Sequence, residues 1–152
     1  MFAGFDLGAN LGYAVLDITG HRVASGTLRL GKRSPESTVK AYQSLGRLFS
    51  KYCPSIVGYE KVTFFGRGFK AAHAYGTYEA VLWLVAVSSQ SLIEQFTVKD
   101  IKRVATGFSN ATKDEVGAAA FTRWAYVTVD DNEADALWVA ECSRRRFLDG
   151  DI

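Results

Sequence analysis

The sequence predicts a mixed α/β fold with a five-stranded sheet, whose first three strands are antiparallel and which is flanked by helices. Three observations support this fold class. Apolar segments typical of strands fill the first 30 residues and are separated by short turns that contain glycine. Helical patterns then alternate with two further short strands. The rest of the chain has helical patterns and helix-capping residues.

The three opening strands are predicted at residues 1–7, 12–18 and 21–30. Gly8, Asn10 and Gly20 lie between them, and such residues favour the tight turns that connect antiparallel strands. The first strand is apolar on both faces, so we expect it at the centre of the sheet.

Ser34 and Pro35 predict the start of the first helix, with Ser34 as N-cap and Pro35 at the first helical position. The helix is expected to run to about Cys53, because Pro54 follows. Its predicted apolar stripe consists of Val39, Tyr42, Leu45, Leu48 and Phe49.

The fourth and fifth strands are expected at residues 56–61 and 92–96, with a long helix from about residue 70 to residue 89 between them. The segment 81–87 of that helix is apolar all round and therefore needs cover on more than one side. A homodimer interface would provide the second cover. A helix buried deep in the core is the alternative.

Threonines are the predicted N-caps of two later helices. Thr97 begins a short helix with Asp100 in its first turn, and Thr112 begins a capping-box helix that runs to about Trp124. The last helix is expected to be capped by Asp131 or Asn132 and to continue to about residue 147.

The bulk composition favours one domain spanning residues 1–152. Hydrophobic residues make up 48% of the chain, and its two cysteines are too few for a disulfide framework or a thiolate metal site. The first strand leaves no room for a secretion signal, and the longest apolar run, 80–88, is too short to cross a membrane. We therefore expect a soluble protein of the cytoplasm.

Three carboxylates occupy unusual positions. Asp6 and Glu60 end apolar strands, and Asp135 lies among apolar residues of the last helix. Burying even a neutral polar group without a partner costs roughly 2–7 kcal/mol, so we expect a cation to meet these carboxylates. Oxygen ligands and few histidines favour Mg²⁺ or Mn²⁺ over zinc. Two such ions would activate a water molecule and stabilise the leaving oxygen of a phosphodiester.

The net charge of +2 is weak evidence for nucleic-acid binding by itself. If the carboxylates gather at one site, however, the remaining surface is more basic than the total suggests. Scattered solubilising charge is the alternative for each basic residue. The candidates for a phosphate-facing side are Arg67, Lys70, Lys99, Lys102, Arg103, Lys113, Arg123, Arg144, Arg145 and Arg146.

In combination, these features resemble the RuvC-type Holliday-junction resolvases of the ribonuclease H-like superfamily. Asp6, Glu60 and the closing Asp-Asn-Glu-Ala-Asp-Ala-Leu segment match the family's acidic residues in order and context. Residues 98–102 and 105–116 resemble its basic segment. The similarity spans nearly the whole chain, and the small size is compatible with a phage version.

The resemblance implies a ribonuclease H-like fold and a Mg²⁺-dependent endonuclease in which Mn²⁺ can substitute. The enzyme would cleave four-way junctions or other branched DNA as a homodimer, with no membrane association and no small-molecule cofactor. Asp6, Glu60 and Asp135 would be catalytic metal ligands. Lys113 would be the lysine important for cleavage. Lys102 would contact phosphate, and Lys99, Arg67 and Lys70 are further DNA-binding candidates.

Two positions depart from the family pattern. The family usually has an acid or a histidine where this chain has Asn132, so we expect Asp131 to be the fourth ligand and keep Asn132 as the alternative. Thr63 stands where the family has an aromatic side chain that enters the junction. Phe64 or Phe65 would have to serve instead, unless they fill the core or the dimer interface.

Two other functions remain open from the sequence. Asn132 is compatible with a catalytically inactive module that binds branched DNA. The segment Asp6-Leu7-Gly8 followed by Gly12 also resembles the phosphate-binding hairpin of sugar kinases and actin-like ATPases. Those proteins need two such domains and a second glycine-rich hairpin, so this alternative is the weaker one.

Overall fold

A five-stranded sheet in the order β3-β2-β1-β4-β5 forms the centre of the computed structural model, which describes residues 1–62, 68–125 and 130–150. Antiparallel pairing joins β1 to β2 and β2 to β3, and parallel pairing joins β1 to β4 and β4 to β5. The predicted sheet is therefore confirmed. Its strands are β1 (Phe2–Asp6), β2 (Asn10–Leu16), β3 (Arg22–Arg29), β4 (Ile56–Glu60) and β5 (Leu92–Phe96).

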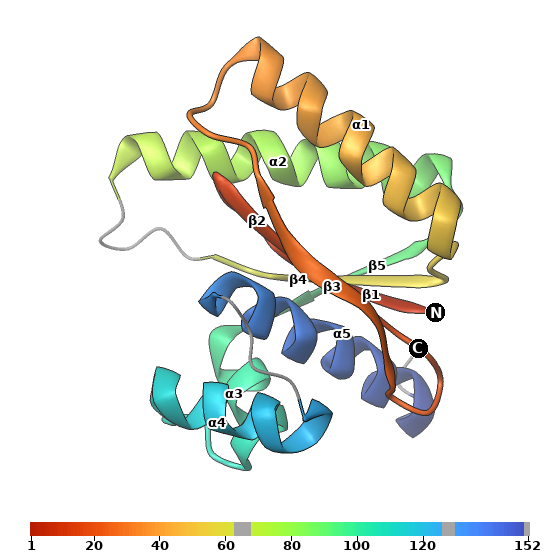
Figure 1. Cartoon of the computed structure of the whole chain (residues 1–152), viewed down its shortest axis with the longest axis vertical. Coiled ribbons are helices and arrows are strands. Elements are labelled where there is room, and N and C mark those ends of the chain that lie inside the picture. The colour runs from red at the N-terminus through yellow and green to blue at the C-terminus, as the bar shows by residue number, and fades with distance from the viewer. Residues whose placement is uncertain (63–67, 126–129, 151–152) are drawn as a thin grey trace.

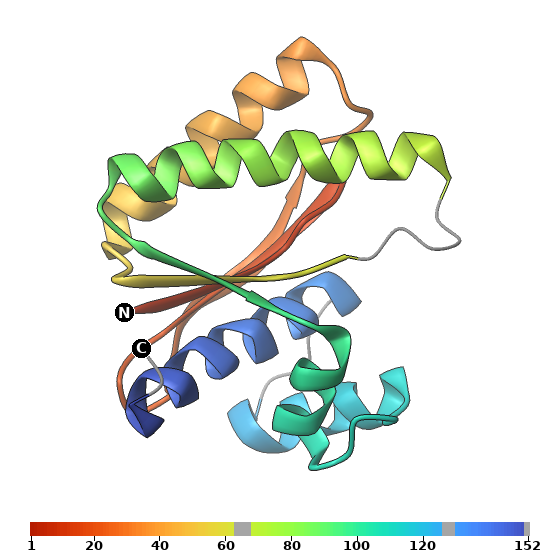
Figure 2. The ribbon, with the colours of Figure 1, turned by 180° about the vertical axis from the view of Figure 1, so that it is seen from behind.

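Helices cover both faces of the sheet. Figures 1 and 2 show α1 (Pro35–Tyr52) and α2 (Phe69–Ser88) on one face, and α5 (Asp131–Asp149) on the other. The shorter helices α3 (Val98–Thr106) and α4 (Lys113–Trp124) pack against α5 on its far side from the sheet. Within the described ranges, no helix is long and apolar enough to cross a membrane.

The strand alternation of β1 decides which of its side chains face which helices. Ala3 and Phe5 belong to the apolar cluster under α1 and α2. Gly4 faces α5, and a Cβ atom built there would lie 2.2 Å from the carbonyl oxygen of Ala136. Only glycine permits this close approach, which brings α5 directly onto the strand that ends in Asp6.

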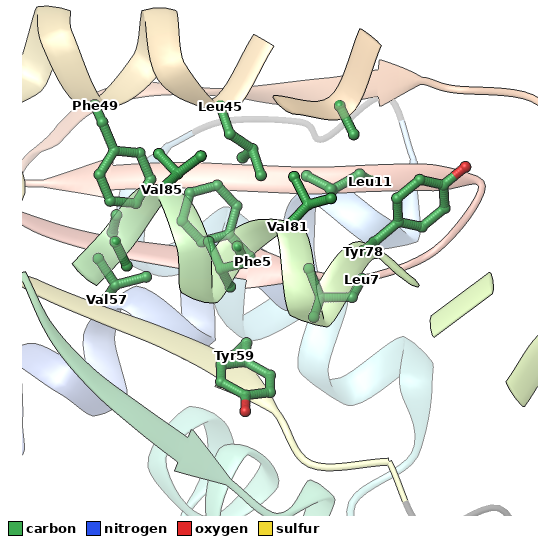
Figure 3. Packing of buried hydrophobic residues seen from close by; sticks show 14 of the residues in the cluster. Phe5, Leu7, Leu11, Leu45, Phe49, Val57, Tyr59, Tyr78, Val81 and Val85 are labelled. Carbon is green, nitrogen blue, oxygen red and sulfur yellow. The ribbon is translucent and has the colours of Figure 1, made fainter. Parts of the chain in front are cut away.

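The main core lies between the sheet and the helices α1 and α2. Figure 3 shows Phe5 and Leu11 of the sheet packed with Phe49 of α1 and Val85 of α2. Tyr59 of β4 is fully buried, and its hydroxyl points away from the apolar cluster. The core therefore fixes β1 and β4, the two strands that carry Asp6 and Glu60.

The cap of α5 differs from the predicted one. Asp130, and not Asp131 or Asn132, is the N-cap, because its side chain accepts a hydrogen bond from the Glu133 amide. The oxygen that accepts this bond also accepts one of 2.8 Å from the Thr27 hydroxyl of β3. The tertiary contact selects one of three consecutive residues that can cap a helix. The helix continues to Asp149, two residues beyond the predicted end.

The buried stripes of α1 and α2 also differ from the sequence patterns. In α1, Val39 and Tyr42 are exposed, while Ser37 and Ala41 join Leu45 and Phe49 in the buried face. The apolar half of α2 is buried on one side only. Its outward residues are Trp83, Leu84 and Val87, which are 43%, 63% and 67% exposed.

Candidate active site

A cavity of about 490 Å³ opens at the ends of β1 and β4, next to the first turn of α5. It contains every acidic residue that the sequence analysis selected, together with Lys102 and Lys113. Its wall is completed by the β1–β2 turn and by apolar side chains of α3 and α4. The lining residues are Asp6, Leu7, Gly8, Ala9, Asn10, Glu60, Val62, Val98, Ile101, Lys102, Lys113, Val116, Asp131, Asn132 and Asp135.

Asp6 and Glu60 reach the cavity because their strands are parallel neighbours. Phe5 of β1 is in register with Tyr59 of β4, so the residues that follow them leave the sheet at the same edge. Phe5 and Tyr59 point into the core under α2, and strand alternation therefore directs the next side chains to the α5 face. Both carboxylates are partly buried there.

The first turn of α5 packs against β2, the strand that pairs with β1 next to Asp6. Gly12 of β2 is in register with Asp6, and a Cβ atom at Gly12 would lie 2.0 Å from the carbonyl oxygen of Asn132. A second link to β3 is the 2.5 Å hydrogen bond from the Ser25 hydroxyl to the buried Glu133 carboxylate. These contacts hold the start of α5 against β2 and β3, next to the strand β1 that carries Asp6.

Asp135 lies one turn further along α5 and also lines the cavity. Burial raises the pKa of its carboxyl above the ordinary value, the ammonium group of Lys113 opposes this rise, and the neighbouring Asp131 adds to it. A carboxylate that is buried beside another acid favours a bound cation, because a cation restores the charge balance that burial removes.

Lys113 and Lys102 supply positive charge to the same cavity. The Nζ atom of Lys113 lies 3.4 Å from the Oδ2 atom of Asp131, and both side chains are largely exposed. Lys102 of α3 is partly buried and lies near enough to Asp135 to oppose the rise of its pKa. Two lysines and several carboxylates thus face one volume, as a site for a cation and a phosphate requires.

The donor set fits a hard divalent cation such as Mg²⁺, because it consists of carboxylate oxygens and the amide oxygen of Asn132. In the described part of the chain, no three histidine, cysteine or acidic side chains are gathered closely enough to hold an ion as they stand. Mg²⁺ commonly keeps several waters and binds through one or two carboxylates. The cavity has room for an ion with part of its water shell.

The other basic candidates fall into three groups. Lys70 and Lys99 are exposed on the first turns of α2 and α3, outside the cavity wall. Phe64, Phe65 and Arg67 lie outside the described residues. The remaining arginines do not form one free basic face. Arg103 pairs with Asp100 and Arg146 with Glu94, while Arg123, Arg144 and Arg145 converge on the buried Glu141.

Some residues of the site were not predicted from the sequence. Asp130 and Thr27 fix the start of α5, and Asn10 lines the cavity from the start of β2. Val98, Ile101 and Val116 form its apolar wall. The N-cap of α5 had a sequence signal, because Asp130 is an aspartate directly before the predicted helix. The wall depends on how α3 and α4 pack, which no local pattern specifies.

Comparison with known proteins supports the resemblance seen in the sequence. The family model described as crossover junction endodeoxyribonuclease RuvC matches residues 3–143. The RuvC of Desulforamulus reducens is 26% identical over 147 residues, covering 91% of this chain and 90% of the relative. The RuvC of Alkaliphilus oremlandii is 29% identical over 147 residues, covering 91% of this chain and 89% of the relative.

The fold has a close counterpart among solved structures. Thermus thermophilus RuvC in complex with a Holliday junction substrate matches with a TM-score of 0.82 and 19% sequence identity. The match covers 97% of this chain and 94% of the solved one. The expected ribonuclease H-like fold is therefore confirmed.

Proposed function

The chain belongs to the RuvC family of crossover junction endodeoxyribonucleases, and we propose that its cavity cleaves four-way DNA junctions with Mg²⁺ as the metal. The family is one of metal-dependent nucleases, and the oxygen donors of this cavity favour Mg²⁺, with Mn²⁺ as a substitute. The observation that carries the proposal is the convergence of Asp6, Glu60 and Asp135 with Lys113 in one cavity.

In this proposal, Asp6, Glu60 and Asp135 are the carboxylates that hold the metal, and Asp131 or Asn132 is the fourth ligand. The bound metal would activate a water molecule and stabilise the oxygen that leaves the phosphodiester. Asp131 is favoured by its negative charge. Asn132 is favoured by its position, because its backbone packs against Gly12 beside Asp6.

The lysines act on the phosphate in the proposed mechanism. Lys113 would stabilise the charge that develops on the scissile phosphate, and the position of its ammonium at the rim of the cavity supports this role. Lys102 contacts a neighbouring phosphate from the wall. Lys70, Lys99 and Arg67 are proposed to bind DNA further out, and Phe64 or Phe65 to stack on a base.

The proposed enzyme is a homodimer, because two symmetric cuts in a junction require two sites at a fixed separation. The outer face of α2 supports this assembly. Trp83, Leu84 and Val87 form an exposed apolar stripe at helical spacing, and Ala80 extends it by one turn. Apolar side chains of this kind are the usual centre of a dimer interface. We define these four residues as the α2 stripe.

We further propose that residues 1–152 form a single nuclease domain that acts on DNA in the cytoplasm. The second candidate function is a module that binds branched DNA without cutting it. Two observations keep it open: Asn132 in place of an acid, and the absence of a ready three-ligand cluster among the described side chains.

One assay separates these functions. Purified protein is incubated with end-labelled junction, flap and linear duplex DNA, with Mg²⁺, with Mn²⁺ or with a chelator. The proposed function predicts paired cuts in the junction with either metal and none with the chelator. Junction binding without cuts under every condition would indicate the non-cleaving module.

A further inference from the structure

Side chains of α2 form hydrogen bonds with the end of β4, where Glu60 lies. The hydroxyl of Tyr75 donates a 2.9 Å hydrogen bond to the backbone carbonyl of Glu60. Tyr75 is only 7% exposed, and its ring belongs to the main core. A packed helix therefore holds the backbone of a residue whose side chain faces the cavity.

The backbone position of Glu60 matters because it is the last residue of its strand. The register between β1 and β4 ends one residue earlier, at Phe5 and Tyr59. On the other side, the Lys61 amide donates to the carbonyl of Phe96 in β5. The bond from Tyr75 adds a constraint at the point where the pairing with β1 has ended. Fixing this peptide limits the directions in which the Glu60 carboxylate can point.

Side chains of α2 and β5 also hold Tyr59, the residue before Glu60. The Tyr59 hydroxyl accepts hydrogen bonds from Trp83 Nε1, at 2.9 Å, and from Gln95 Nε2. Burial raises the pKa of the Tyr59 hydroxyl, and the negative charge of the nearby Glu79 carboxylate adds to the rise. The Tyr75 hydroxyl also lies 3.3 Å from the Glu79 carboxylate. Glu79 thus lies near both tyrosines at the end of β4.

We propose that Tyr75 is a positioning residue that sets the orientation of Glu60 for metal binding, supported through Glu79 and Tyr59. The proposal rests on the proposed function, because it takes Glu60 as a metal ligand. It extends that function because it gives α2, which lies on the opposite face of the sheet from α5, a role in the site. Outer residues that orient a metal ligand commonly change metal affinity or activity by about 10–100-fold when they are replaced.

The chain offers a matched control for this test. Tyr78, less than one turn from Tyr75, is fully buried and donates a 3.2 Å hydrogen bond from its hydroxyl to Ser37 of α1. Tyr75→Phe and Tyr78→Phe each remove one buried hydroxyl from α2 and keep the ring. Only the first removes a contact with Glu60. A loss that merely reflects a weakened helix would appear in both variants.

Two measurements are made on the wild type and both variants as full-length protein. The first is the Mn²⁺ concentration that produces half of the metal-induced rise in melting temperature without DNA. The second is the Mg²⁺ dependence of the single-turnover cleavage rate on a four-way junction. For Tyr75→Phe we expect both half-saturating concentrations to rise about tenfold, with wild-type values for Tyr78→Phe.

Equal metal dependence in Tyr75→Phe and the wild type would overturn the proposal, as would the same shift in both variants. If the wild type does not cut any junction, the proposed function fails. In that case the metal-induced rise in melting temperature still tests the role of Tyr75, because this measurement requires metal binding and no cleavage.

Discussion

Lys113 Nζ lies 3.4 Å from Asp131 Oδ2, and this contact joins the first residues of α4 and α5 at the rim of the cavity. The two side chains are 77% and 78% exposed, so their pairing contributes little to stability. The lysine is therefore held near the acidic residues and stays accessible to a DNA phosphate.

Replacing Lys113 with alanine is expected to slow cleavage strongly and to leave junction binding nearly unchanged. Loss of one preorganised donor to the developing charge commonly lowers a rate by about 100-fold or more. Single-turnover cleavage and a gel-shift titration of the same junction measure the two effects. Lys51→Ala on α1, on the opposite face of the sheet, is the control. An unchanged rate in Lys113→Ala would remove this lysine from the mechanism.

Asp135→Asn is expected to raise the melting temperature of the metal-free protein while abolishing cleavage. Folding raises the pKa of Asp135, so the ionised side chain lowers the stability of the folded state at neutral pH. An uncharged side chain of the same shape removes this cost. A gain of about 1 kcal/mol would raise the melting temperature by about 2–4 °C in a domain of this size.

The same variant should lose most of the rise in melting temperature that Mg²⁺ causes in the wild type. Asp114→Asn, an exposed residue in the first turn of α4, is the control and should keep that rise. A lower melting temperature in metal-free Asp135→Asn would show that the carboxylate stabilises the fold without a metal. That result would contradict the proposal that Asp135 is a metal ligand whose charge is unfavourable without the metal.

Glu141 is predicted to be an acid-sensitive stabilising group outside the cavity. It is fully buried, and burial alone would raise its pKa. Hydrogen bonds from Arg144 and Arg145 outweigh burial and hold the pKa below the ordinary value. Its contribution is therefore complete above the unfolded pKa and is lost as the pH falls through the lower, folded pKa.

Glu141→Gln should cost about 3 kcal/mol of unfolding free energy at pH 7, because Arg144 then keeps a largely buried charge without its carboxylate. Urea unfolding at pH 7 and at pH 3 measures the effect. The difference from the wild type should shrink at pH 3, because the unfolded state takes up a proton below the ordinary glutamate pKa while the folded state resists protonation. An equal difference at both pH values would exclude an ionic role for Glu141.

Glutamate at Leu84 or Val87 is expected to separate the proposed dimer into monomers, since it places a charge in the α2 stripe. Sedimentation equilibrium should give twice 16.7 kDa for the wild type and 16.7 kDa for either variant. Phe121→Glu is the control, because Phe121 is also exposed, at 54%, but lies on α4. A monomeric wild type at micromolar concentration would argue against dimerisation through α2.

The sequence predicted the sheet well because its strands have local signals. The apolar run that ends in Asp6 and the glycine-containing turns around β2 define the antiparallel part. The capping boxes at Thr97 and Thr112 lie at the starts of α3 and α4, as predicted. Each of these features depends on residues within a few positions of one another.

Features that depend on tertiary packing were not predictable in the same way. Residues 130–132 can all cap a helix, and the contact with Thr27 favours Asp130. The apolar segment 81–87 does not reveal which of its faces meets α1. The role of Tyr75 depends on a bond to the end of another element, 15 residues away, and has no sequence signature.

The most direct test of the metal site compares junction binding and cleavage in the wild type and in Asp6→Asn. Both proteins are expected to bind a four-way junction with the same affinity in the absence of metal. With Mg²⁺, the wild type should then cut the junction and Asp6→Asn should leave it intact. Mg²⁺-dependent cutting by Asp6→Asn at the wild-type rate would contradict the role of Asp6 as a metal ligand.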